Sequence, residues 1–295
     1  LHSFPTRRSS DLTFMMASGL HTVQEFFAQL YANTSVEAEP ASAGRMMNGH
    51  FATRTLNEDG TWKELKKLKN SSADISPTAG QMLRLVGLAH ASKYYRDNKE
   101  LIGENQFSEN GNEIAWGTIG NASTSEGHFF EAINAAGVLK VPMIISVWDD
   151  EYGISVHAKY QTTKQNISEI LKGFELNDKG EGFNIYRVNG WDYPELVRVY
   201  ETAAKEAREK HIPAIVHVKE LTQPQGHSTS GSHERYNSKE RLQWELENDC
   251  VLKFRQWILS SGLSTEQELT RLEEDAKIFV NVAKKSAWEN YLAPI

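Results

Sequence analysis

Cysteine is almost missing from this chain of 295 residues, in which Cys250 is the only one. A single thiol excludes an internal disulfide and any metal cluster built on cysteines, a composition typical of a reducing compartment such as the cytoplasm. The sequence also lacks an apolar run long enough to cross a membrane. Its formal net charge of −7 comes without a basic stripe. We therefore expect a cytoplasmic protein that binds neither nucleic acid nor a membrane.

The first twelve residues, LHSFPTRRSSDL, differ in character from the rest. They resemble the translation of a sequencing-library adapter, and no apolar signal segment follows Arg7 and Arg8, so an export signal is not indicated. A natural disordered tail is the alternative. We treat 1–12 as a non-native tail and expect the true N-terminus to be missing.

From Thr13 onwards, apolar runs alternate with amphipathic segments. This alternation predicts an α/β fold with a mostly parallel sheet covered by helices on both faces. Expected strands are 114–119, 142–148, 183–188 and 214–218; expected helices are 22–33 with Thr22 as N-cap, 79–95, 126 onwards and 192–210 with Asp192 as N-cap, and 163–174 is amphipathic. The segment 34–75 is irregular, and the chain is helical and charged from Ser238. We expect one α/β domain over 13–262 and a helical extension or linker over 263–295.

The stretch 119–153 is a βαβ unit whose two polar ends, Asn121 and Asp149-Asp150, follow apolar runs. The carboxyl ends of neighbouring parallel strands meet at one edge of a sheet, where open α/β sheets bind ligands. Oxygen ligands of this kind suit Mg²⁺. On spacing alone, however, a solvated turn is the better explanation of Asp149-Asp150.

The whole stretch resembles the thiamine-diphosphate motif of the decarboxylating components of 2-oxoacid dehydrogenases. In that motif an acid between glycines opens the segment and an Asn-Asn pair closes it about thirty residues later. The matching positions are Gly120, Ser125-Glu126-Gly127, Phe130-Glu131-Ala132, Asn134, Pro142 and Tyr152-Gly153-Ile154-Ser155, the last as in the branched-chain branch. The resemblance extends from about His21 to Lys253, and it implies a thiamine-diphosphate-binding fold of the alpha type.

The resemblance also implies the residues of a cofactor site. Mg²⁺ would be held by Asn121, Asp150 and the backbone carbonyl of Tyr152. Cofactor contacts fall on Gly120, Ala122, Ser123, Asp150, Tyr152, Ser76, Thr78 and Gln81. The family's acid is Asn121 here, and its metal-binding asparagine is Asp150, so carboxylate and amide are exchanged. A charge count predicts that Mg²⁺ is still bound; the alternative is a weakened site.

Three further segments carry resemblances. Gln225–Ser230 resembles the family loop whose histidine lies beside cofactor and substrate, which makes His227 a catalytic candidate. The segment Gly44–Phe51 (GRMMNGHF) resembles the family's GRxMPxHY, which makes His50 a second catalytic candidate. The segment beginning at Ser76 resembles SPLATQ, which in some relatives also binds a monovalent cation, although Gly80 replaces the threonine ligand. Trp148 stands where the branched-chain branch commonly has an arginine. The remaining candidates, His90, His128, His157, His211, His217 and His233, show no partner pattern.

The implied activity is oxidative decarboxylation of a 2-oxoacid, branched-chain or pyruvate, with transfer of the acyl group to a lipoyl domain. The implied partners are a beta-type decarboxylase subunit or half, which would supply the activating glutamate, and a lipoyl-bearing acyltransferase, so a hetero-oligomer is expected. One alternative is a degenerate subunit that keeps the fold without the cofactor, motivated by Asn121 and Trp148. Another is a transketolase-like carboligase. A nicotinamide-binding fold is disfavoured because GxGxxG follows none of the predicted strands.

Overall fold

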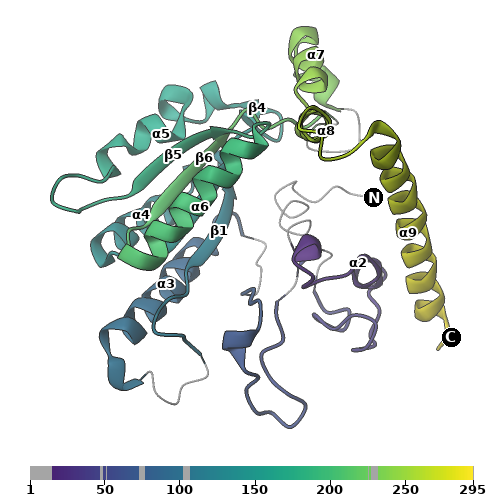
Figure 1. Cartoon of the computed structure of the whole chain (residues 1–295), viewed down its shortest axis with the longest axis horizontal. Coiled ribbons are helices and arrows are strands. Elements are labelled where there is room, and N and C mark those ends of the chain that lie inside the picture. The colour runs from purple at the N-terminus through teal and green to yellow at the C-terminus, as the bar shows by residue number, and fades with distance from the viewer. Residues whose placement is uncertain are drawn as a thin grey trace. The chain divides into compact units, whose positions relative to one another are not determined.

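The computed structural model describes residues 15–46, 49–50, 52–72, 77–101, 107–224, 226 and 232–294 (Figure 1). They fall into two compact units, one within Ser76–Trp257 and the other within Thr6–Ile75 and Ile258–Ile295. These limits differ from the expected domains 13–262 and 263–295, which stay a prediction because a compact unit is not a demonstrated folding domain.

The first unit is built on a four-stranded parallel sheet in the order β1-β2-β6-β5 (Figure 1). The strands are β1 (Ala115–Gly120), β2 (Met143–Trp148), β5 (Asn184–Asn189) and β6 (Ala214–Lys219). All neighbouring pairs are parallel, with Gly120 opposite Trp148 and Trp148 opposite Val218. The predicted parallel sheet is confirmed, and the strands end together at one edge.

Helices cover both faces of this sheet, as the alternation predicts. On one face α3 (Met82–Asp97), α4 (Gly127–Leu139) and the short α5 (Ile167–Ile170) pack around Phe129, which is fully buried with Met82 and Ile145. On the other face α6 (Tyr193–Lys210) packs Val199, Ala203 and Ala207 against Ile144 and Val216. Asp192 caps α6 by accepting a hydrogen bond from the Glu195 backbone, as predicted.

The amphipathic segment 163–174 is not one continuous helix. It consists of a 3₁₀ turn (Thr163–Gln165), α5 and a second 3₁₀ turn (Leu171–Phe174). Lys164 and Gln165 adopt φ values of 60° and 56°, which interrupt a right-handed helix. Ile167 and Leu171 on either side are nevertheless buried against the sheet, so the apolar periodicity reports packing rather than helix length.

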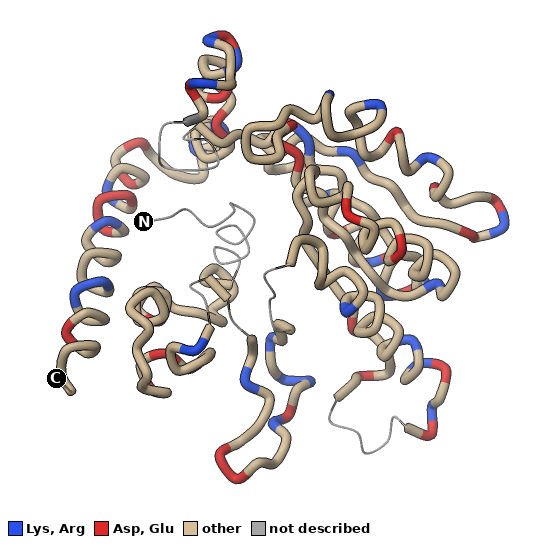
Figure 2. The backbone as a smooth tube through the Cα atoms, turned by 180° about the vertical axis from the view of Figure 1, so that it is seen from behind, with Lys and Arg blue, Asp and Glu red and all other residues tan. Residues whose placement is uncertain are grey.

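A two-stranded antiparallel hairpin, β3 (Tyr152–Gly153) and β4 (Val156–His157), follows β2. The remaining short elements are 3₁₀ turns at Leu65–Lys67, Lys99–Leu101, Asn121–Ser125 (η3), Ala158–Tyr160 and Ser232–Arg235. The chain ends in α7 (Lys239–Glu247), α8 (Cys250–Ser260) and α9 (Glu266–Leu292), as predicted from Ser238 onwards. Acidic and basic residues alternate along α9 (Figure 2).

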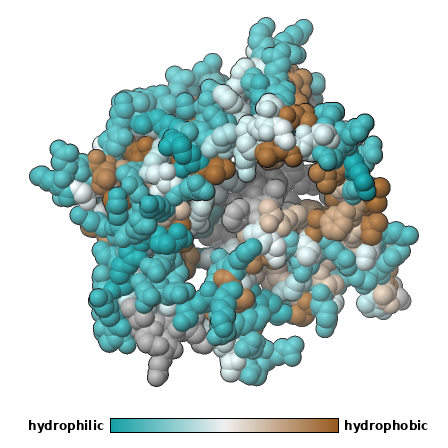
Figure 3. Space-filling view, in the orientation of Figure 1, coloured by the Kyte–Doolittle hydropathy of each residue, from teal (hydrophilic) through white to brown (hydrophobic). Residues whose placement is uncertain are grey.

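The second unit pairs α2 (Val23–Leu30) with α9. Thr22 caps α2, and a capping box with Glu25 confirms the predicted start. The Tyr31 ring lies 5.1 Å from that of Trp288 and 6.2 Å from that of Tyr291, so aromatic packing joins the two helices. Other apolar side chains of α9, such as Phe279, are exposed, and apolar surface is visible along this helix in Figure 3.

Within the described residues, no helix is both long enough and apolar enough to cross a lipid bilayer.

A candidate cofactor and metal site at the carboxyl edge of the sheet

The ends of β1 and β2 bring the two predicted metal-binding side chains to the same edge of the sheet. Gly120 and Trp148 are paired at the last position of the two strands. Asn121 follows Gly120 as the first residue of η3, and Asp150 lies two residues beyond Trp148. Asn121 is buried, and its backbone oxygen accepts a hydrogen bond of 2.5 Å from the Thr124 hydroxyl.

Two of the buried polar atoms that lack a hydrogen-bond partner among the described residues belong to predicted cofactor contacts. They are the Ser123 hydroxyl in η3 and the Oε1 atom of Gln81, which immediately precedes α3. Leaving such an atom unpaired costs about 1–3 kcal/mol, so unpaired polar atoms of this kind suit a site that receives a polar ligand. The Ser123 hydroxyl can donate to a diphosphate oxygen, whereas Gln81 Oε1 is an acceptor and suits a donor group of a ligand.

The β3–β4 hairpin lies directly against η3. A Cβ atom on Gly153 would come within 2.8 Å of the Ala122 Cβ, closer than real contacts, so this position requires glycine. The side-chain amide of Gln161, four residues after β4, donates a 3.0 Å hydrogen bond to the Ala122 carbonyl. This bond connects the segment that follows the hairpin to the same turn. The contact places Tyr152, a predicted ligand through its carbonyl, next to the turn that carries Ala122 and Ser123.

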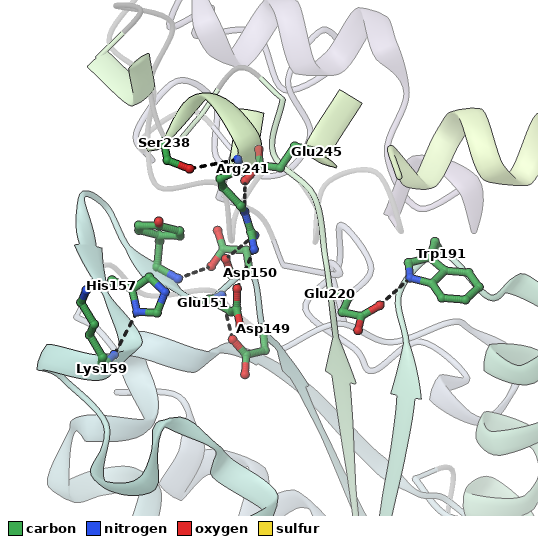
Figure 4. Close-up of polar contacts among 11 residues, drawn as sticks. Asp149, Asp150, Glu151, His157, Lys159, Trp191, Glu220, Ser238, Arg241 and Glu245 are labelled. Carbon is green, nitrogen blue, oxygen red and sulfur yellow. Dashed lines mark hydrogen bonds and ion pairs between the residues drawn. The ribbon is translucent and has the colours of Figure 1, made fainter. Parts of the chain in front are cut away.

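Asp149 and Asp150 shape the turn between β2 and the hairpin (Figure 4). Asp149 Oδ1 accepts a 2.8 Å hydrogen bond from the Glu151 N–H, and Asp150 Oδ1 accepts one of 3.1 Å from the Tyr152 N–H. Burial raises the pKa of Asp150 to about 6; the Asp149 and Glu245 carboxylates add to the rise, and the Tyr152 N–H opposes it. A carboxylate that is costly to ionise gains most from a bound cation.

Asp149 also belongs to a buried network that continues into the core. Its Oδ2 atom lies 2.8 Å from His217 Nε2, and His217 Nδ1 lies 3.0 Å from the Ser168 hydroxyl. His217 comes from β6 and Ser168 from α5, and both are fully buried. One ring nitrogen of His217 therefore contacts the Asp149 carboxylate and the other contacts the Ser168 hydroxyl, which itself donates to Asn166 Oδ1 (2.9 Å), so both ring nitrogens have a polar partner. The network fixes the residue that precedes Asp150.

The network was not anticipated from the sequence. The one available signal was His217 itself, because a histidine inside the apolar strand sequence AIVHV needs a buried polar partner.

Other predicted site residues are placed as follows. Thr78 lies in the turn before α3. His50 belongs to the other compact unit, where it is buried. The Gln29 side chain holds the backbone at this position: it accepts a hydrogen bond from the Gly49 N–H (2.7 Å) and donates one to the His50 carbonyl. Ser76 and His227 lie outside the described residues. The roles of all four stay predictions.

Among the described residues, no three His, Cys, Asp or Glu side chains converge as a metal-binding group. The predicted set is of another kind, because it combines one carboxylate with an amide oxygen and a backbone carbonyl.

Comparison with known families gives a match to the model described as "Dehydrogenase E1 component" over residues 8–294. The chain belongs to this family. The resemblance seen in the Gly120–Gly153 motif is thereby confirmed, together with the α/β fold expected from it.

Curated relatives of this E1 chain carry the names of alpha subunits. This chain is 28% identical over 201 residues to "Pyruvate dehydrogenase E1 component subunit alpha" of Rickettsia bellii. The aligned region covers 67% of this chain and 54% of that protein. The chain is 26% identical over 286 residues to "2-oxoisovalerate dehydrogenase subunit alpha" of Bacillus subtilis, covering 96% and 74%. A mitochondrial 2-oxoisovalerate dehydrogenase alpha subunit of Caenorhabditis elegans is 28% identical over 264 residues, covering 87% and 51%. The chain thus spans about half the length of some relatives.

Proposed function

We propose that this chain is the alpha-type half of a thiamine-diphosphate-dependent enzyme that decarboxylates a 2-oxoacid and transfers the acyl group to a lipoyl domain. The observation that carries the proposal is the position of Asp150. Its partly buried carboxylate follows β2 at the edge where η3, with the unpaired Ser123 hydroxyl, follows β1. Membership of the E1 family and the alpha-subunit names of the relatives support it.

Each residue has a distinct part in this proposal. The Asn121 amide oxygen, the Asp150 carboxylate and the Tyr152 carbonyl hold Mg²⁺, and Gly120, Ala122 and Ser123 receive the diphosphate that the cation neutralises. Bound thiamine diphosphate supplies an electron sink for the charge left when carbon dioxide departs. Further cofactor contacts come from Ser76, Thr78 and Gln81.

Histidines and a partner complete the proposed reaction. His227 would hydrogen-bond the substrate and assist acyl transfer, and His50 is a second catalytic candidate. A beta-type subunit would contribute the glutamate that activates the cofactor, and a lipoyl-bearing acyltransferase would accept the acyl group. Names of relatives include both pyruvate and 2-oxoisovalerate dehydrogenases, so either class of 2-oxoacid fits.

Calorimetric titration with thiamine diphosphate and Mg²⁺, with a beta-type partner present, tests the proposal. We expect saturable binding that requires both the cofactor and the cation. Well-folded protein that binds neither would contradict it and favour a degenerate subunit. Assaying 2-oxoacids with a lipoyl acceptor in parallel with sugar phosphates separates the proposed activity from a transketolase-like one.

The variant Asn121→Asp tests whether the exchanged pair is a working metal site. If Asp150 supplies the needed charge, we expect the Mg²⁺ dissociation constant to change by less than about threefold, because a second buried carboxylate adds desolvation cost as well as attraction. Titration of Mg²⁺ against the wild-type and variant proteins measures this. A gain of tenfold or more would show that Asn121 has weakened the site, with roughly 1.4 kcal/mol restored by the charge.

A further inference from the structure

The turn that carries Asp150 and Tyr152 is not held by its own backbone preference. Glu151 has a φ of 67° and Ile154 a φ of 62°, both in the left-handed region. Residues other than glycine reach this region at a cost on the order of 1–2 kcal/mol each, and a β-branched residue such as Ile154 is least suited to it. An arrangement of this kind persists only when surrounding groups hold it.

Arg241 of α7 supplies such a hold by contacting three consecutive residues of the turn (Figure 4). Its Nη2 donates to the Asp150 carbonyl (3.2 Å), its Nη1 to the Glu151 carboxylate (2.6 Å), and its guanidinium lies 5.8 Å from the centre of the Tyr152 ring. The planar guanidinium offers several donors in a fixed fork, which a lysine cannot reproduce.

The guanidinium is itself fixed from its own helix. Its Nε donates to Glu245 Oε1 (2.9 Å), and the Trp244 ring lies 4.7 Å from it. The Arg241 side chain is 18% exposed and that of Glu245 only 4%. Ser238 caps α7 by accepting from the Arg241 N–H (3.2 Å), so Arg241 sits in the first turn of the helix.

This first turn of α7 comes shortly after the segment with the predicted catalytic His227. Tyr236, between the two, has its ring 5.5 Å from that of Tyr152. Tyr236, just before α7, and the turn Asp150–Tyr152 are therefore joined through Arg241 and the Tyr152–Tyr236 ring contact.

We propose that Arg241 is a positioning residue, which holds the Asp150 carboxylate and the Tyr152 carbonyl in the arrangement that binds Mg²⁺ with a diphosphate. Its guanidinium contacts the backbone of the metal-binding turn and not the metal. The part of this inference that concerns the ligand rests on the proposed function, whereas the part that concerns the turn does not. A purely structural role for the same ion pairs would stabilise α7 without affecting the metal.

A ligand-free measurement tests the turn first. Amide hydrogen exchange is followed at Glu151 and Tyr152, whose N–H groups are bonded to Asp149 and Asp150. In Arg241→Met we expect exchange at these two amides to speed up by about tenfold or more, as for loss of a charge-assisted hydrogen bond. The control is Arg198→Met on α6, which removes an exposed arginine–glutamate pair with Glu195 and should leave both amides unchanged. Equal exchange in the two variants would overturn the proposal.

Titration of Mg²⁺ in the presence of thiamine diphosphate and the beta-type partner tests the ligand. We expect the dissociation constant for Mg²⁺ to rise about 10- to 100-fold in Arg241→Met, the range seen when a supporting residue of a metal site is lost. Arg241→Lys should give an intermediate value, and Arg198→Met the wild-type value. Unchanged affinity in both Arg241 variants would overturn the ligand part. Failure of wild-type protein to bind would instead overturn the proposed function, and the exchange result would still decide the role of Arg241 in the turn.

Discussion

Replacing His217 by leucine is expected to lower the free energy of unfolding by about 2–3 kcal/mol, the cost of leaving buried polar groups, one of them a carboxylate, without their hydrogen-bond partner. His217 is fully buried, and its ring joins the Asp149 carboxylate to the Ser168 hydroxyl at 2.8 Å and 3.0 Å. Leucine fills a similar volume, so a cavity adds little. The loss would come from two buried polar groups left without the imidazole. Urea unfolding of the ligand-free protein measures it.

Two further variants make this prediction specific. Ser168→Ala removes the hydroxyl that contacts both His217 Nδ1 and Asn166 Oδ1 and should cost about 1–2 kcal/mol. His157→Leu alters a partly exposed histidine whose Nδ1 accepts from the Lys159 N–H, and it should change stability by less than about 1 kcal/mol. A cost for His217→Leu no greater than that of His157→Leu would show that the network contributes little to folding.

Replacing Asp150 by asparagine is expected to stabilise the cation-free protein at pH 8 and to weaken Mg²⁺ binding. Burial raises the pKa of Asp150 from 3.8 to about 6. A raised folded-state pKa means that the protonated group contributes stability below about pH 4, and this contribution is lost as the pH rises through about 6. A shift of this size corresponds to roughly 2–3 kcal/mol, which the neutral amide would not lose.

Unfolding in the presence of a chelator at pH 4, 6 and 8 measures the effect. The wild-type and variant proteins should be about equally stable near pH 4, diverge between about pH 4 and pH 6, and keep a constant difference above that range, with the variant more stable. Asp178→Asn, which alters an exposed carboxylate, is the matched control and should show no such divergence. A variant less stable than wild type at pH 8 would mean that the ionised carboxylate is favoured in the folded protein.

Mg²⁺ affinity should move in the opposite direction. Because Asn121 is already an amide, Asp150→Asn leaves the predicted ligand set without a carboxylate, and the dissociation constant should rise by at least about tenfold. Higher stability together with lower affinity is the pattern expected of a residue kept for binding rather than for folding.

The position of the candidate site could be predicted because it depends on local pattern. Apolar runs ending at Ile119 and Trp148, with a helix between them, define a right-handed βαβ unit. Asn121 and Asp150 follow the two strand ends, so any parallel pairing brings them to one edge. Thr22 and Asp192 were likewise predicted as caps from their immediate neighbours, since a cap bonds to backbone only three residues away.

The sequence by itself thus determined the α/β class, the strands and main helices of the sheet unit, and the edge at which Asn121 and Asp150 lie. Tertiary structure alone decided what supports the site. His217 meets Asp149 only because β6 pairs beside β2, and Arg241 reaches Asp150 across about ninety residues of chain. Such partners depend on strand order and side-chain direction. Both are set by packing the whole core, because neighbouring residues in sequence carry no information about which distant element arrives beside them.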